Sequence, residues 1–207
     1  MASVTKRGPY AKTAARQREI LDAAGEVFAT HGYRAGSLKE IADRVGIDSS
    51  TILHHFANKS VLLQKVLEDR DTRSLGDAAP DAAAGAADIP AAFLRLARAN
   101  ERIPGIVVLY TLLAAESATP EHPSNEYFFL RYARVRAEFT AAFREMADAG
   151  LLRPGVEPEF AALSTLALWD GLQVQWMHDS DAIDIVGTLR GQLELLTTVE
   201  LDEEETG

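Results

Sequence analysis

Three small hydroxyl residues, Ser49, Ser50 and Thr51, lie together at the start of a short helical stretch. Small side chains let a helix backbone approach a DNA groove closely, and their hydroxyl groups can bond base edges or phosphates. Lys59 follows at the start of the next predicted helix, where its ammonium group and the free N–H groups of the helix terminus suit one phosphate. These residue types indicate contact with nucleic acid.

Two short helices joined by a tight turn are needed to position these side chains. Ser37 and Glu40 form the S-x-x-E capping pattern, which predicts a helix start at Ser37, and Gly46 predicts its end. Asp48 can cap a second helix, over 49–56, with its carboxylate on the free N–H groups. A helix pair of this size commonly places its second helix in the major groove of DNA. The periodicity alone leaves open the alternative of a small three-helix bundle without a ligand.

Further helices are predicted on both sides of this pair. Ile20, Ala24, Val27 and Phe28 share one face of a helix that Gly32 ends. The remaining signals are Ile52 and Phe56, which would face inward from the 49–56 helix, and Asn58, which would cap a helix over 59–73.

The positive charge of the chain is concentrated near its N-terminus. The formal net charge of the whole chain is −10, which argues against a polyanionic partner. Residues 1–73, however, contain 12 Lys and Arg against 9 Asp and Glu, whereas residues 74–207 contain 9 against 22. The N-terminal part of the chain therefore has enough positive charge to contact DNA phosphates, and the alternative is a solvated arm without a ligand. The first 18 residues include Lys6, Arg7, Lys12, Arg16 and Arg18 and no acid.

Residue types follow a specific order between Arg18 and Leu63. The ordered positions are Ile20, Leu21, Ala23, Ala24, Phe28, Gly32, Tyr33, Ser37, Ile41, Ala42, Val45, Gly46, Ile47, Thr51, His55, Phe56, Lys59 and Leu63. This order resembles that of the TetR (tetracycline-repressor-like) family of bacterial regulators. The resemblance covers about the first quarter of the chain. It implies an all-helical homodimer that binds a palindromic operator, most often as a repressor, until a small effector releases it.

The resemblance also implies roles for individual residues of the DNA-binding segment. By position, Ser49, Ser50 and Thr51 correspond to groove-facing residues of the recognition helix. The family usually has Tyr where this chain has Leu53. Either His54 replaces the phosphate contact of that Tyr, or Leu53 meets an apolar target such as a thymine methyl. The phosphate contacts implied are His54, His55 and Lys59, and further candidates nearby are Ser37, Lys39, Tyr33, Arg34 and Arg44.

The second half of the chain is also predicted to be helical. Pro90, Pro104 and Pro158 each resemble a proline in the first turn of a helix. A helix ended by Gly150 carries the stripe Phe128, Tyr132, Val135, Phe139, Phe143 and Met146, and a last helix is expected over about 183–198.

Aromatic side chains in this half suggest a cavity for a small, mostly apolar effector, with a packed core as the alternative. Leu166, Trp169, Gln173 and Trp176 share one face of a predicted helix, and other helices add further aromatic rings. The candidate effector residues are Tyr110, Phe128, Tyr132, Trp169, Gln173 and Trp176.

The last two helices are the expected dimer seam, because their leucines recur at the spacing of a helix–helix contact. A two-fold arrangement would bury Ala161, Leu168, Leu172, Leu189, Leu193 and Leu196.

Composition sets the remaining expectations. The chain has no Cys and no run of 18 apolar residues, and its N-terminus lacks the apolar stretch of a signal peptide, so we expect a cytoplasmic protein without a membrane span. The five His residues are scattered, and no nucleophile motif or metal-ligand spacing is present. We therefore predict no enzyme activity, no cofactor and no metal.

The predicted fold is all-α, with an N-terminal three-helix DNA-binding domain that contains a helix-turn-helix and a C-terminal helical domain for ligand binding and dimerisation. The expected function is a ligand-responsive transcriptional regulator, a repressor whose partners are a double-stranded DNA operator, a small effector and a second copy of the chain. A helical ligand-binding or protein-interaction module without DNA binding is the alternative. The predicted domains are a helix-turn-helix domain with a basic arm at 1–58, a connecting helix at 59–75, a flexible Ala/Gly/Pro/Asp loop at 76–90, the effector and dimerisation domain at 91–199, and an acidic tail at 200–207.

Overall fold

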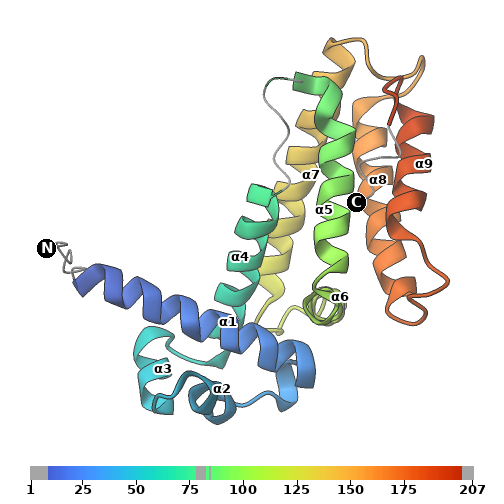
Figure 1. Cartoon of the computed structure of the whole chain (residues 1–207). Coiled ribbons are helices and arrows are strands. Elements are labelled where there is room, and N and C mark those ends of the chain that lie inside the picture. Colours follow the sequence, from blue (N-terminus) through green and yellow to red (C-terminus); the bar gives the residue numbers. More distant parts are fainter. Residues whose placement is uncertain (1–8, 78–82, 84, 202–207) are drawn as a thin grey trace, which may run out of the picture. The chain divides into compact units, whose positions relative to one another are not determined.

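The computed structural model describes residues 9–77, 83 and 85–201 (Figure 1). Lys6 and Arg7 of the predicted basic arm lie outside the described residues, as do residues 78–82 and 84 of the predicted loop at 76–90 and residues 202–207 of the acidic tail. The described part of the chain is helical apart from turns and one isolated bridge between Leu152 and Thr197. The all-α prediction is therefore confirmed.

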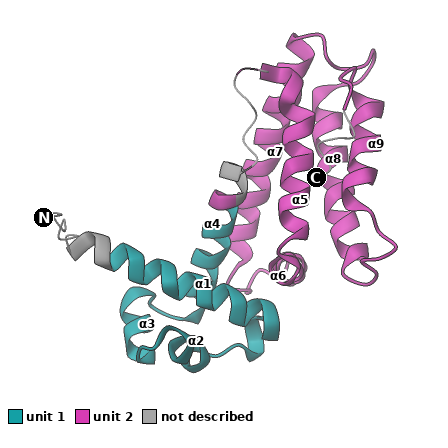
Figure 2. Cartoon of the chain, viewed as in Figure 1, with its two compact units in different colours: residues 1–71 teal, residues 72–207 magenta. Residues whose placement is uncertain are grey.

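The chain divides into two compact units, residues 1–71 and residues 72–207 (Figure 2). The first unit contains α1 (Pro9–Ala35), α2 (Leu38–Val45), α3 (Ser49–His55) and the first part of α4 (Lys59–Asp77). The second contains the rest of α4, a 3-10 turn η1 (Gly85–Asp88), α5 (Ile89–Glu101), α6 (Pro104–Glu116), α7 (Asn125–Asp148), α8 (Pro158–Trp176) and α9 (Ile185–Leu196).

The caps predicted for the first unit are present. The backbone of α1 is interrupted at Gly32, whose φ of 73° is in the left-handed region that favours glycine. The Ser37 hydroxyl accepts the N–H of Glu40 at 3.1 Å and begins α2, and Gly46, with φ 70°, ends it. Asn58 accepts the N–H of Val61 at 2.9 Å in the first turn of α4. The interior of the unit consists of Ile20, Ala24, Val27, Phe28, Ile41, Ala42, Ile52, Phe56, Leu62, Leu63, Val66 and Leu67.

In the second unit, α8 packs against α6, α7 and α9, and α5 packs against α9. The proline prediction is confirmed, since Pro90, Pro104 and Pro158 lie in the first turns of α5, α6 and α8. α5 begins at Ile89, so Ile89 and Pro90 are buried helical residues and not part of a loop. Phe93 of α5 stacks on Phe139 of α7 with the ring centroids 4.4 Å apart.

Most residues of the predicted dimer seam are buried within the single chain. Its residues lie on α8 and α9, but they face the core of a single chain together with Phe139, Phe143 and Met146. These side chains pack against other helices of the same chain. The five that are fully buried are Ala161, Leu172, Leu189, Leu193 and Leu196, and Leu168 is partly buried against the same core.

Phe143 is the largest fully buried side chain of this core. We expect Phe143→Ala to lower the free energy of unfolding by about 3–5 kcal/mol, because the substitution removes buried apolar surface and leaves a cavity. Urea unfolding followed by circular dichroism measures this loss. A loss below about 1 kcal/mol would contradict the assignment of Phe143 to the core.

Candidate nucleic-acid interface and effector cavity

α3 presents the predicted groove-contacting side chains on a capped helix. The carboxylate of Asp48 accepts hydrogen bonds from the N–H and the hydroxyl of Ser50, both at 3.0 Å. These bonds, the backbone one first, hold the pKa of Asp48 below its ordinary value, so the cap is ionised at neutral pH. Ile52 and Phe56 are buried beneath the helix, as predicted. The solvent side of α3 is therefore available for contacts.

The polar residues of α3 have graded exposure. Ser50 and His54 are exposed, whereas Ser49, Thr51 and His55 are half-buried. Leu53 is 45% exposed. An apolar side chain on the outer face of this helix fits contact with a thymine methyl better than contact with a phosphate.

Lys59 has contacts inside the first unit that the sequence did not reveal. Its Nζ donates to the carbonyl of Arg34 at 3.1 Å and lies 4.7 Å from the centroid of the Tyr33 ring. The hydroxyl groups of Tyr33 and Ser60 are 2.9 Å apart. Desolvation in this setting lowers the pKa of Lys59 from its ordinary value. Lys59 therefore joins the start of α4 to the end of α1.

We expect Lys59→Ala to have one effect on stability and, if the predicted phosphate contact exists, a separate effect on DNA binding. Loss of the Arg34 contact and of the cation–π contact should lower stability by about 1 kcal/mol. If Lys59 contacts a phosphate, as the sequence predicts, its loss should also reduce the slope of log DNA affinity against log salt by about one unit. A fluorescence-anisotropy series at several salt concentrations measures this slope, and an unchanged slope would restrict Lys59 to a structural role.

The other cations predicted near the DNA differ in their availability. Arg44 is held by two acids, with its guanidinium 3.1 Å from Glu26 and 3.3 Å from Glu40. Glu40 also lies 3.0 Å from Nε2 of His31. Lys39, by contrast, is exposed on α2. Lys39 therefore remains a better candidate for a phosphate contact than Arg44.

The second unit contains a half-enclosed cavity of about 220 Å³ between α6, α7 and α8. Three residues predicted for an effector site, Tyr110, Tyr132 and Gln173, line it. The other three do not: the ring of Phe128 lies 5.1 Å from that of Tyr110, and Trp169 and Trp176 pack in the core. The remaining lining residues are Thr111, Ala114, Ala115, Asp170 and Val174.

Asp170 is the charged residue among the lining residues that the sequence analysis missed. Burial is the main cause that raises its pKa, and Arg131 together with a hydrogen bond from Tyr132 opposes this rise. The same burial, with the negative charge of Asp170, raises the pKa of Tyr132 to about 12. The sequence of α8 could have pointed to Asp170, because the only other charged residue of this helix is Glu159 in its first turn.

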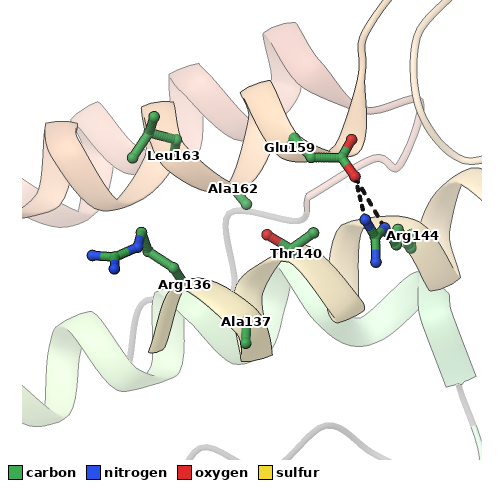
Figure 3. Close-up of a pocket in the computed structure, with 7 residues that line it drawn as sticks. All are labelled: Arg136, Ala137, Thr140, Arg144, Glu159, Ala162 and Leu163. Atoms are coloured by element: carbon green, nitrogen blue, oxygen red, sulfur yellow. Dashed lines mark hydrogen bonds and ion pairs between the residues drawn. The ribbon is translucent and has the colours of Figure 1, made fainter. Parts of the chain in front are cut away.

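A second hollow, of about 390 Å³, lies on the surface between α7 and α8 (Figure 3). Arg144 of α7 reaches across it to Glu159 of α8, with Nε and Nη2 at 3.1 and 2.5 Å from one carboxylate oxygen. Leu163, which is 58% exposed, borders the hollow. Phe160, on the same helix, is 64% exposed. This region is therefore an apolar surface bordered by charge.

Known protein families match both the N-terminal and the C-terminal part of the chain. Residues 20–66 match the model for bacterial regulatory proteins of the tetR family, and residues 117–195 match that for the C-terminal region of BetI-type transcriptional repressors. The transcriptional repressor KstR2 of Mycolicibacterium smegmatis is 39% identical over 56 residues, which are 27% of this chain and 27% of the relative. The transcriptional activator FasR of the same organism is 37% identical over 67 residues, 32% of this chain and 31% of the relative.

Solved structures resemble the chain over most of its length. A TetR-family regulator from Rhodococcus sp. has a TM-score of 0.75 at 18% identity, covering 89% of this chain and 100% of that one. SmeT, the repressor of a multidrug efflux pump of Stenotrophomonas maltophilia, has a TM-score of 0.73 at 21% identity, covering 93% and 96%. At these identities the likeness shows the fold. Because family models match the N-terminal and C-terminal parts and the helical fold extends over both, the chain belongs to the TetR family of bacterial regulatory proteins.

Proposed function

We propose that the chain is a transcriptional repressor that binds a palindromic operator as a homodimer and is released by a small effector. The observation that carries the proposal is α3, a capped helix with a buried inner face and a polar outer face, within the segment that matches the tetR family model. The family consists of transcriptional regulators and not of enzymes. The matched activator FasR makes activation the second candidate outcome at the same operator.

The proposed DNA contacts are divided between the groove and the backbone. Ser49, Ser50 and Thr51 face base edges, and Leu53 meets a thymine methyl. The phosphate contacts are His54, His55 and Lys59, with Ser37 and Lys39 at the start of α2. A cytoplasmic location follows from an operator target, and every helix among the described residues is too short or too polar to span a bilayer.

The proposed dimer surface is the exposed apolar face of α8 and α9. Phe160, Leu163 and Val174 of α8 and Leu195 of α9 are all large side chains open to solvent, with exposed fractions of 64%, 58%, 44% and 75%. The small residues Ala167 and Gly171 lie between them on α8 and allow a second helix to approach closely. A two-fold axis through this face would cover the same patch on both subunits.

Effector control follows from the symmetry of the dimer. Two recognition helices reach successive major grooves when they are about 34–36 Å apart. An effector that binds better to a dimer with another spacing lowers operator affinity by the ratio of its affinities for the two states. α4 is the proposed connection, because this one helix (Lys59–Asp77) crosses the boundary between the two units.

The test uses fluorescence anisotropy with the promoter of the chain's own gene and with DNA of scrambled sequence. We expect at least a 100-fold preference for the promoter at physiological salt, since specific regulators exceed their own nonspecific binding by about 10³-fold or more. Equal affinity for both DNAs would instead favour a ligand-binding or protein-interaction module.

A further inference from the structure

The cavity between α6, α7 and α8 has one charged residue among those that line it, Asp170. Its carboxylate is half-buried and accepts a hydrogen bond from the Tyr132 hydroxyl. A carboxylate in a partly desolvated site favours a positive charge nearby, because burial weakens its hydration and strengthens Coulombic attraction. Asp170 is therefore the acidic group through which this cavity wall can attract a cation.

The aromatic wall of the cavity already interacts with a cation. The guanidinium carbon of Arg131 lies 4.4 Å from the centroid of the Tyr110 ring, and Arg131 also interacts electrostatically with Asp170. Arg131 is half-buried and is not one of the residues that line the cavity. Its interactions show that the Tyr110 ring and the Asp170 carboxylate together form an environment suited to positive charge.

The remaining lining groups define the ligand further. Tyr110 and Gln173 are buried, with 3% and 6% of their surfaces exposed, so their groups facing the cavity are held in place by packing. The Gln173 amide oxygen can accept an N–H donor. Ala114, Ala115 and Val174 supply apolar surface. A volume of about 220 Å³ limits the ligand to a compact molecule.

We infer that the effector is a compact protonated amine with an apolar body, bound by the Asp170 carboxylate between the rings of Tyr110 and Tyr132. The inference rests on the proposed effector function of this unit. An anion would be repelled by the carboxylate, and a neutral apolar ligand would leave the interactions of Asp170 with Tyr132 and Arg131 as they are and gain nothing from its charge. The ligand ammonium competes with Arg131 for Asp170.

Matched probes of equal size test the charge of the ligand. Benzylammonium, benzyl alcohol and benzoate share one ring and differ in the charge of one substituent. Isothermal titration calorimetry on the full chain at pH 7 should show benzylammonium binding at least ten-fold more tightly than benzyl alcohol, and benzoate more weakly than both. Equal affinities, or a preference for benzoate, would overturn the inference.

Two variants of the cavity have opposite expected effects. Asp170→Asn should weaken benzylammonium binding at least ten-fold and change benzyl alcohol binding by less than two-fold. Arg131→Gln should strengthen benzylammonium binding several-fold, because it removes the competing cation. Asp148→Asn, at an exposed acid near the end of α7, is the matched control and should change neither. A fold defect would weaken binding in both cavity variants, so weaker cation binding to Arg131→Gln would contradict the inference.

Operator binding separates this inference from the proposed function. If the chain binds its promoter but shows no preference for the cation, the ligand class is wrong and the DNA-binding function remains. If it binds the cation but no promoter, the proposed function fails and the ligand class remains. The expected result is that saturating benzylammonium lowers promoter affinity in the wild-type chain and leaves it unchanged in Asp170→Asn.

Discussion

Ser50→Glu should reduce operator affinity at least 100-fold without unfolding the protein. Ser50 is exposed in the first turn of α3, and this N-terminal end of the helix is proposed to enter the groove. A carboxylate there would face the negative potential of the DNA and lose the hydroxyl contact, and a 100-fold loss corresponds to about 2.7 kcal/mol. Fluorescence anisotropy with promoter DNA measures the loss.

The same position supplies its own control. Ser50→Lys changes the same side chain to one of similar length and opposite charge, so it should retain or increase binding to nonspecific DNA. Ser50→Ala should have a small effect, because it removes one hydroxyl and adds no charge. If both charged variants lost binding equally, damage to the Asp48 cap would explain the result, and the groove-facing role of Ser50 would be wrong.

The helices of the first unit were predictable because local signals define them. Ser37, Gly46, Asp48 and Asn58 each act within three or four residues of their own position, through hydrogen bonds or backbone conformation. The inward orientation of Ile52 followed from helical periodicity in the same way. The contacts of Lys59 were not predictable, since its partner Arg34 is 25 residues away and is joined to it only by the packing of α1 and α4.

Periodicity alone could not show which residues of α8 and α9 are buried within the single chain. Leu189, Leu193 and Leu196 share one face of α9, but periodicity shows which residues lie together and not which helix covers them. In the structure α5 and α8 pack against α9 in the same chain. The exposed apolar residues of α8 have equally regular spacing, so the sequence contains two stripes and no local signal that distinguishes them.

The effector cavity shows a similar limit. Aromatic residues at helical spacing give the same pattern whether they line a cavity or fill a core. Here Tyr110 and Tyr132 line the cavity, whereas Trp169 packs in the core. A more specific sign of the cavity in the sequence was an acidic residue. A single acid within an apolar helix, as Asp170 is in α8, needs a partner or a functional reason because burying an unmatched charge is costly.

Leu163→Glu should convert the protein from a dimer to a monomer. Leu163 is 58% exposed on α8, close to Phe160 and within the proposed dimer surface. Two-fold symmetry places two new carboxylates in one interface, where each loses hydration and the two repel each other. We expect the dimer dissociation constant to rise at least 100-fold, which sedimentation velocity at several concentrations measures.

Operator binding should fall with the dimer, because one recognition helix contacts only one half-site and loses the gain in affinity from linking two binding events. Leu112→Glu, at a leucine of α6 that is 51% exposed, adds the same charge outside the proposed surface and should remain dimeric. Thermal unfolding of each monomeric species separates a lost interface from a lost fold. A Leu163→Glu protein that stays dimeric and binds the operator normally would place the two-fold contact elsewhere, and the exposed apolar face of α8 would then need another partner.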